Sequence, residues 1–124
     1  MDKKYLDYIT EKIIGCAFEV SNTLGAGFLE KVYQNAMVIE LRDNDLQIVK
    51  EKPITIYYKN QIVGEYFPDI MVNNQIILEI KAVSALNEIH QAQLLNYLKA
   101  TELYLGLLIN FGTPRIQIKR MVSG

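Results

Sequence analysis

Apolar residues recur at three- and four-residue steps in three stretches of the chain, which is the spacing of an amphipathic helix. In the first stretch these positions are Leu6, Ile9, Ile13, Ala17 and Val20. They predict a helix over residues 4–20. The same spacing appears from about residue 27 to 42 and again from about 86 to 101, so we expect two further helices there. Ser84 is a candidate N-cap for the third helix.

The remaining apolar residues fall into shorter runs that have the length of strands. Five runs predict strands: residues 47–58, 61–72, 75–83, 103–111 and 115–122. Lys59-Asn60 between the first two runs is a hairpin turn signal. Pro53 has no backbone N–H, which restricts the first run to a sheet edge or to an irregular start.

The order of these elements predicts the architecture. It reads helix, helix, three strands, helix, two strands (ααβββαββ). The helix between the third and fourth strands forms a crossover, so those two strands are expected to be parallel, while the first three form an antiparallel meander. The sequence contains no internal repeat and no linker. We therefore expect one α/β domain over residues 1–124, with a single mixed β-sheet flanked by helices on both faces.

Composition and charge limit the classes of protein to consider. The 124 residues are enough to bury a core, and the net charge of −1 with a pI of about 5.8 argues against a strong sequence-independent binder of nucleic acid. The acidic balance does not exclude a nuclease, because bound cations reverse the local charge. Cys16 is the only cysteine, which excludes a disulfide within one chain and a thiolate zinc site.

We expect neither a membrane-spanning segment nor a secretion signal from this sequence. No apolar run approaches the roughly 20 residues that span a bilayer. The first residues, MDKKYLDYITEK, lack the apolar stretch and the cleavage site of a secretion signal. By elimination we expect a cytoplasmic protein without a membrane partner.

Two acidic residues and a lysine stand on strands that are predicted to be neighbours. Pro68-Asp69 lies near the end of one run, and Glu79-Ile80-Lys81 lies inside the next, in the largely apolar segment QIILEIKAV. An acid followed by acid-x-lysine is the pattern of a magnesium-dependent nuclease site. Glu-x-Lys alone is common as an exposed charged pair. Its position in a strand that is predicted to be buried makes it stronger evidence for a functional site, because a buried charge requires a partner.

The length of the strand connection decides whether these groups can meet. With a two-residue turn at Asn73-Asn74, Asp69 would oppose Leu78, and the carboxylates of Asp69 and Glu79 would point to opposite faces. With a three-residue connection over residues 73–75, Asp69 opposes Glu79 directly. We predict the three-residue connection, or an equivalent bulge just before Asp69.

Two like charges that face each other on adjacent strands are destabilising unless they are neutralised. Mg²⁺ prefers one or two carboxylates together with water and phosphate oxygens, so Asp69 and Glu79 predict a Mg²⁺ or Mn²⁺ site. Such an ion lowers the pKa of a bound water and stabilises charge on the phosphorus oxygens. Lys81, on the same strand face as Glu79, would orient or deprotonate the water or stabilise the transition state.

Five short motifs together resemble a known family. They are Gly27 to Tyr33 (GFLEKVY, a GxxExxY pattern), Pro68-Asp69, Glu79-Ile80-Lys81, Gln93 to Tyr97 (QLLNY) and Gly106 to Gly112 (GLLINFG). In combination, over about residues 5–122, the sequence is similar to the GxxExxY protein family. That family is placed in the PD-(D/E)XK nuclease superfamily, which has the restriction-endonuclease-like fold.

The resemblance implies roles for individual residues. Asp69 and Glu79 would be the main metal ligands, the Ile80 carbonyl a further contact, and Lys81 the catalytic lysine. Glu30 would be the helix-borne acid that completes the metal site. The remaining candidates would support the active site or the substrate; these are Gln93 and Tyr97 of the QxxxY motif, His90 on the same helix row, and Tyr33 of the GxxExxY motif.

Three functions fit this set of residues. The first is a metal-dependent nuclease that hydrolyses phosphodiester bonds in DNA, the expected partner, through Asp69, Glu79 and Lys81. The second is a nucleic-acid-binding or protein-binding regulatory protein that keeps the fold without efficient catalysis. The third is a nuclease acting on RNA or on a special end structure, because no 2′-hydroxyl reader is identifiable. A homodimer would double the basic contacts to a duplex.

Overall fold

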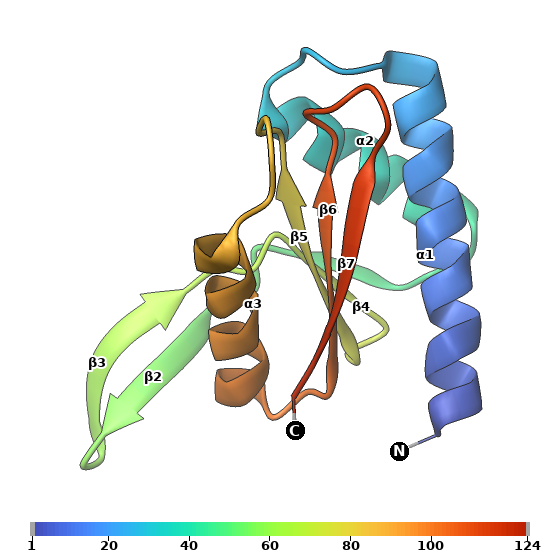
Figure 1. Cartoon of the computed structure of the whole chain (residues 1–124). Coiled ribbons are helices and arrows are strands. Elements are labelled where there is room, and N and C mark those ends of the chain that lie inside the picture. The colour runs from blue at the N-terminus through green and yellow to red at the C-terminus, as the bar shows by residue number, and fades with distance from the viewer. Residues whose placement is uncertain (1, 124) are drawn as a thin grey trace.

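A computed structural model of the chain describes residues 2–123 and contains three helices and seven strands (Figure 1). The elements are α1 (Lys3–Leu24), α2 (Glu30–Asp43), β1 (Ile48–Lys50), β2 (Ile54–Tyr58), β3 (Gln61–Tyr66), β4 (Ile70–Val72), β5 (Ile76–Lys81), α3 (Glu88–Thr101), β6 (Leu105–Asn110) and β7 (Gln117–Val122). Met1 and Gly124, the ends of the expected domain, lie outside the described residues. No helix within residues 2–123 is long and apolar enough to cross a membrane.

Five strands form the central sheet, in the order β1-β4-β5-β6-β7. β5 and β6 are parallel and are joined by the α3 crossover, while the other neighbouring strands are antiparallel. This arrangement confirms the predicted mixed sheet and its parallel pair. Five of the six residues of β5 are buried, as expected for a central strand that is covered on both faces.

The predicted three-stranded meander is wrong. Each of its first two strands is divided in two, so that β1 pairs with β4 in the main sheet while β2 pairs with β3 in a separate two-stranded sheet. Glu51 has a φ of 50° and Pro53 lacks an N–H, and together they interrupt the extended chain between β1 and β2. Phe67-Pro68 separates β3 from β4 in the same way.

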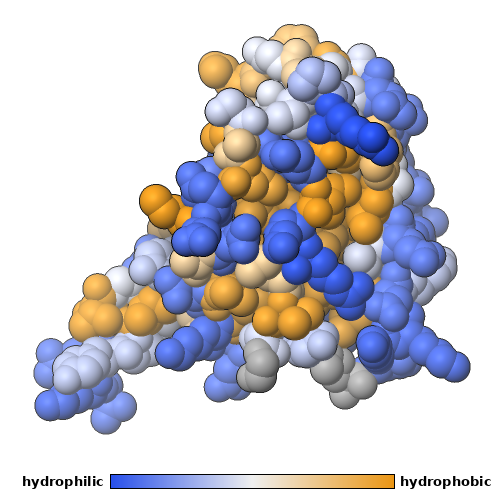
Figure 2. Space-filling model, in the orientation of Figure 1, coloured by the Kyte–Doolittle hydropathy of each residue, from blue (hydrophilic) through white to orange (hydrophobic). Residues whose placement is uncertain are grey.

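We call residues 54–66 the arm, because β2 and β3 project from the body of the molecule (Figure 1). The hairpin turn at its tip was predicted correctly. Lys59 and Asn60 both have positive φ (49° and 62°), and Tyr58 pairs with Gln61 across the turn. Apolar side chains are exposed along the arm (Figure 2). Ile62 and Val63 are among the exposed residues of β3.

The two faces of the sheet have separate hydrophobic cores. α1 and α2 cover one face, where Ile70, Leu78 and Ile80 point. α3 covers the other face and packs on Met71 and Ile77 through Leu94 and other residues, so α2 and α3 lie on opposite sides of the sheet (Figure 1). Side chains alternate along a strand, so Glu79 and Lys81 share the face of Ile77, beneath α3.

Three helix boundaries differ from the predicted ones by two residues or more. α2 begins at Glu30 instead of at about residue 27. α1 continues to Leu24 and ends at Gly25, which has a φ of 71°. α3 begins at Glu88, and its N-cap is Asn87 instead of Ser84. The Asn87 carboxamide oxygen accepts hydrogen bonds from the N–H groups of Ile89 and His90. The imidazole Nδ1 of His90 accepts in return from the Asn87 N–H at 3.3 Å, which completes a capping box.

Asn110 and Gly112 hold the chain segment that follows Lys81. The fully buried Asn110 carboxamide accepts from the N–H of Val83 and donates to the carbonyl of the same residue, both at 2.9 Å. It also accepts from the Gly112 N–H and donates to the Gln117 side chain. A Cβ atom at Gly112 would collide with the backbone nitrogen and oxygen of Val83. Only glycine therefore fits at residue 112 without displacing this segment.

The contact between Gly112 and Val83 predicts a loss of stability on substitution. Gly112→Ala should lower the free energy of unfolding by about 1–3 kcal/mol, because backbone atoms cannot move aside as a flexible side chain can. Gly15→Ala is the matched control. A Cβ at Gly15 meets nothing within 4 Å, and alanine is the better helix former, so this change should raise stability by about 0.5–1 kcal/mol. Urea denaturation measures both, and equal effects of the two substitutions would contradict the close packing.

Candidate active site

The connection between β4 and β5 places Asp69 beside Glu79. Val72 pairs with Ile76 and Ile70 pairs with Leu78, so three residues join the strands, as predicted. Asn73 and Asn74 both have positive φ, and the Gln75 N–H donates to the Val72 carbonyl at 3.0 Å. Continued by one residue, the register sets Asp69 opposite Glu79. Both side chains then lie on the sheet face that α3 covers.

Two crossed hydrogen bonds fix this carboxylate pair. The backbone N–H of Asp69 donates to Oε1 of Glu79 at 3.0 Å. The backbone N–H of Ile80 donates to Oδ2 of Asp69 at 2.7 Å. Each carboxylate is therefore held by the strand of the other, at the point where the β4–β5 ladder ends. Hydrogen bonds from a backbone N–H to a charged acceptor are stronger than neutral ones.

The second oxygen of each carboxylate, Glu79 Oε2 and Asp69 Oδ1, has no hydrogen-bond partner among residues 2–123. Within that part of the chain, no fully buried side-chain nitrogen or oxygen lacks a hydrogen-bond partner. Each of these two oxygens therefore keeps some exposed surface and is not bonded to another protein group, although Glu79 as a whole is buried.

The Ile80 carbonyl is a third oxygen at the same position. Antiparallel residues that face each other exchange N–H and C=O hydrogen bonds in alternate pairs. Continuing the register from Ile70 and Leu78 by two residues brings Pro68 opposite Ile80. Proline has no N–H to donate, and the Ile80 N–H bonds to the Asp69 side chain instead. The Pro-Asp sequence thus leaves a backbone carbonyl without a ladder donor next to two carboxylates.

Burial and mutual repulsion raise the pKa of both acids. The Glu79 side chain is buried, and its pKa rises to about 8, first through loss of hydration and then through the charge of Asp69. Burial also raises the pKa of Asp69, against the opposing hydrogen bond from Ile80. The Lys81 ammonium lowers both pKa values but does not cancel the increase. Placing negative charge on both acids is therefore unfavourable in the protein alone.

A chain of hydrogen bonds runs from Lys81 into α3. The Lys81 ammonium donates to Oε1 of Gln93 at 3.3 Å, and Nε2 of Gln93 donates to the Tyr97 hydroxyl at 3.0 Å. Burial and then the charges of Glu79 and Asp69 raise the Tyr97 pKa to about 12, so the hydroxyl stays protonated. Gln93 and Tyr97, both named from the QxxxY spacing, thus lie beside the acid pair.

Glu30 lies near this site without joining it. Its charge raises the pKa of Asp69 and of Glu79, but within residues 2–123 no three His, Cys, Asp or Glu side chains converge on a metal-sized position. α2 packs on the opposite face of the sheet from Asp69 and Glu79, and Glu30 is in its first turn. The role of Glu30 as a metal ligand stays a prediction.

α2 contacts the site through a residue that was not singled out from the sequence. Gln34, one helical turn after Glu30, is buried and donates from Nε2 to the Asp69 carbonyl at 3.1 Å. The Glu51 N–H donates to the same carbonyl at 3.1 Å. The four-residue spacing from Glu30 placed Gln34 on the relevant helix face, whereas no sequence signal pointed to Glu51.

Tyr33 and His90 make structural contacts away from the acid pair, and their supporting role stays a prediction. The fully buried Tyr33 donates from its hydroxyl to the Gly25 carbonyl at 2.6 Å, accepts from the Phe28 N–H, and stacks on Phe111 with ring centroids 4.8 Å apart. It shapes the loop that leads into Glu30 and cannot itself contact a substrate. His90 caps α3, as described above, one helical turn before Gln93.

Comparison with known proteins identifies the family and the fold of this chain. The family model of the PD-(D/E)XK nuclease superfamily matches residues 7–121. A solved structure described as the crystal structure of SSO0001 superposes with a TM-score of 0.60 at 19% identity, over 76% of this chain and 50% of that one. This chain thus spans about half the length of that protein, and the likeness confirms the restriction-endonuclease-like fold. No curated protein in the comparison matches the sequence. Because the family model covers nearly the whole chain, the protein belongs to the PD-(D/E)XK nuclease superfamily.

Proposed function

We propose that this protein is a divalent-metal-dependent nuclease that hydrolyses phosphodiester bonds in DNA. One observation carries the proposal. Asp69 and Glu79 form a crossed carboxylate pair with open oxygens, and Lys81 follows on the same strand face. Membership of the superfamily is consistent with this chemistry.

The donor set fits Mg²⁺ or Mn²⁺. Asp69, Glu79 and the Ile80 carbonyl offer only oxygen atoms, which are the ligands that hard divalent cations prefer. Two buried acids with raised pKa values also favour a cation, which offsets the repulsion between them. When bound, the ion would supply charge neutralisation and lower the pKa of a water molecule.

Lys81 is the group that would act on the phosphate or the attacking water. Its hydrogen bond to Gln93 limits where the ammonium can point, and Tyr97 in turn orients Gln93. A fixed positive charge beside the carboxylates stabilises negative charge that develops on phosphate oxygens in the transition state. Gln93 and Tyr97 thus act as positioning residues, and Lys81 as the catalytic residue.

The proposal has two further parts, which are membership of a narrower family and a second candidate function. The motif Gly27-x-x-Glu30-x-x-Tyr33 supports membership of the GxxExxY protein family. The second candidate is a nucleic-acid-binding protein of the same fold that does not cleave efficiently. One observation favours it: within residues 2–123 no third acid converges on the pair.

A cleavage assay tests the nuclease proposal. We expect the purified protein to cut DNA in Mg²⁺ or Mn²⁺ and to lose activity in EDTA. Glu79→Gln and Lys81→Ala should each reduce the rate by about 100-fold or more, because each removes charge from the reacting centre. Linear, circular and single-stranded DNA and RNA, separated on gels, identify the preferred substrate.

Matched controls separate activity from contamination. Glu65→Gln and Lys59→Ala make similar changes on the exposed arm and should leave the rate unchanged. Equal cleavage by wild type, Glu79→Gln and Lys81→Ala would refute the nuclease proposal. Binding of nucleic acid without cleavage would favour the second candidate.

The raised pKa of Glu79 predicts how stability depends on pH. Between its ordinary value of 4.5 and about 8, the folded protein keeps a proton on Glu79 that the unfolded chain releases. The folded state therefore binds more protons in this window, and the free energy of unfolding of the metal-free protein should fall as pH rises from about 4.5 to 8. Glu79→Gln should flatten this decline. Urea denaturation in EDTA across this range measures both.

Metal should reverse the trend, because a cation binds the deprotonated acids. Mg²⁺ should therefore stabilise wild type more at pH 8 than at pH 5, and should have little effect on Glu79→Gln. The exposed substitution Glu65→Gln serves as the control and should behave as wild type. A metal-free protein whose stability rises across the window would contradict the assignment.

A further inference from the structure

A hollow of about 270 Å³ opens between the arm and α3, next to the candidate active site. Its lining comes from β3 and from one face of α3: Tyr66, Ile89, Ala92, Gln93, Asn96 and Tyr97. The helical residues follow three- and four-residue steps, so they form one continuous side of the helix. We call this space the base hollow.

We propose that the base hollow binds one unpaired nucleobase of the nucleic-acid strand whose phosphate lies at Asp69, Glu79 and Lys81. This inference rests on the proposed function and specifies its substrate as a strand with an unpaired nucleotide beside the cleaved bond. It assigns a binding role to Tyr66, Ile89 and Asn96.

The walls of the base hollow suit the flat faces of a base. Tyr66 is 43% exposed, and its ring rests against Tyr97 with centroids 5.4 Å apart and planes inclined at 59°. Tyr97 thus supports the ring and leaves part of it free for stacking. Ile89, in the first turn of α3, is 77% exposed. A base between Tyr66 and Ile89 would cover apolar surface on both sides, as in proteins that bind single strands by stacking.

The polar groups of the base hollow suit the edge of a base. Gln93 and Asn96 each carry an amide oxygen that accepts and an amide nitrogen that donates, and a base edge presents the same two kinds of group. Among residues 2–123, no charged side chain lines this hollow. An uncharged ligand with mixed hydrogen-bonding groups therefore fits better than a phosphate. A paired base exposes neither its faces nor its pairing edge, so the base has to be unpaired.

Gln93 connects the base hollow to the active site. It lines the hollow and also accepts the hydrogen bond from Lys81 at 3.3 Å. A base at Gln93 would thus belong to a nucleotide whose phosphate is within reach of the Lys81 ammonium. Filling the hollow would position the strand before the chemical step.

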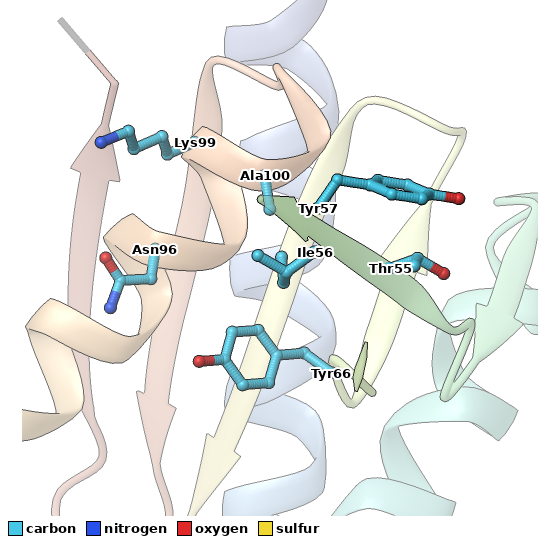
Figure 3. A pocket seen from close by; sticks show the side chains of 7 residues that line it. All are labelled: Thr55, Ile56, Tyr57, Tyr66, Asn96, Lys99 and Ala100. Carbon is cyan, nitrogen blue, oxygen red and sulfur yellow. The ribbon is translucent and has the colours of Figure 1, made fainter. Parts of the chain in front are cut away.

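A larger hollow of about 530 Å³ adjoins the base hollow at Tyr66 and Asn96, and Figure 3 shows its lining. It shares Tyr66 and Asn96 with the base hollow but is otherwise bounded by Thr55, Ile56, Tyr57, Lys99 and Ala100. Figure 3 shows the Tyr66 hydroxyl directed toward α3 and the Lys99 side chain extending away from the hollow. Neither Gln93 nor Tyr97 lines this space, so the chain of hydrogen bonds from Lys81 does not reach it. The smaller hollow is the one linked to the active site.

Fluorescence anisotropy with labelled oligonucleotides tests the proposal. Single strands and duplexes of one sequence, as DNA and as RNA, are titrated with the full chain in Ca²⁺, and gels verify that they stay intact. Wild type should bind the single strand more tightly than the duplex. Tyr66→Leu should weaken single-strand binding about tenfold and Ile89→Ala about fivefold, while duplex binding stays the same. The DNA and RNA series show which strand supplies the base.

Two control substitutions make the same changes, Tyr to Leu and Ile to Ala, at exposed positions of the arm. Tyr58→Leu and Ile62→Ala alter side chains that are 63% and 66% exposed and line neither hollow, so they should leave both affinities unchanged. Tyr66→Phe keeps the ring and should bind as wild type. Circular dichroism checks that each variant is folded, and Ile89→Ala, at an exposed helix position, serves if Tyr66→Leu does not fold.

The outcomes separate this inference from the nuclease proposal. No single-strand binding by wild type, an equal loss for single strand and duplex, or no loss in either variant would each overturn the base hollow. A selective loss in a protein that shows no cleavage would support the base hollow and refute the nuclease. Cleavage by wild type, with binding unchanged in Tyr66→Leu and Ile89→Ala, would refute the base hollow alone.

Discussion

The crossed hydrogen bonds between Asp69 and the segment Glu79-Ile80 are the interaction on which the rest of the site depends. They end the β4–β5 ladder, because the backbone N–H groups of Asp69 and Ile80 donate to side-chain carboxylates instead of to backbone carbonyls. Removing either carboxylate thus leaves a backbone N–H without its acceptor. The acids are therefore part of the hydrogen bonding of the sheet as well as of its chemistry. These hydrogen bonds hold the two acids in a defined geometry in the protein alone.

The surrounding elements restrict this pair from several directions. The Gln34 side chain of α2 and the Glu51 backbone N–H both donate hydrogen bonds to the Asp69 carbonyl. These bonds fix the backbone of Asp69. On the far side, the Lys81 carbonyl accepts from the Phe111 N–H at 2.8 Å, and Asn110 holds the segment that follows. The backbone on both sides of the acid pair is thus anchored, and only the side-chain tips remain open to a ligand. Such an arrangement favours preorganised chemistry over adaptable binding.

Periodicity and turn chemistry predicted most of the framework. The three helices followed from local spacing, and the parallel pair followed from the helix between its strands. The odd-length connection at residues 73–75 was predicted from the requirement that Asp69 and Glu79 share a face, because local spacing also allowed a two-residue turn. The separate pairing of β2 with β3 in the arm was not predicted. The alternation of apolar and polar residues along a strand does not indicate which strand is its neighbour. Pro53 indicated an edge but not a second sheet. Asn110 was hidden within an apolar run, since most of the hydrogen bonds of its carboxamide are tertiary contacts with Val83 and Gln117. The position of Glu30 depends on the packing of α2, which the sequence pattern does not specify.

The arm enters and leaves the main sheet at a single point. Lys50 pairs with Ile70, and the Glu51 N–H bonds to the Asp69 carbonyl, so the chain departs and returns between adjacent residues of two paired strands. Everything between these positions is, in topological terms, an insertion into a β1–β4 hairpin. Insertions whose ends lie together can change length and sequence while the host sheet keeps its pairing. This segment can therefore change without altering the pairing of the main sheet, with one constraint: it must still end in Pro68-Asp69, which supplies one carboxylate of the pair.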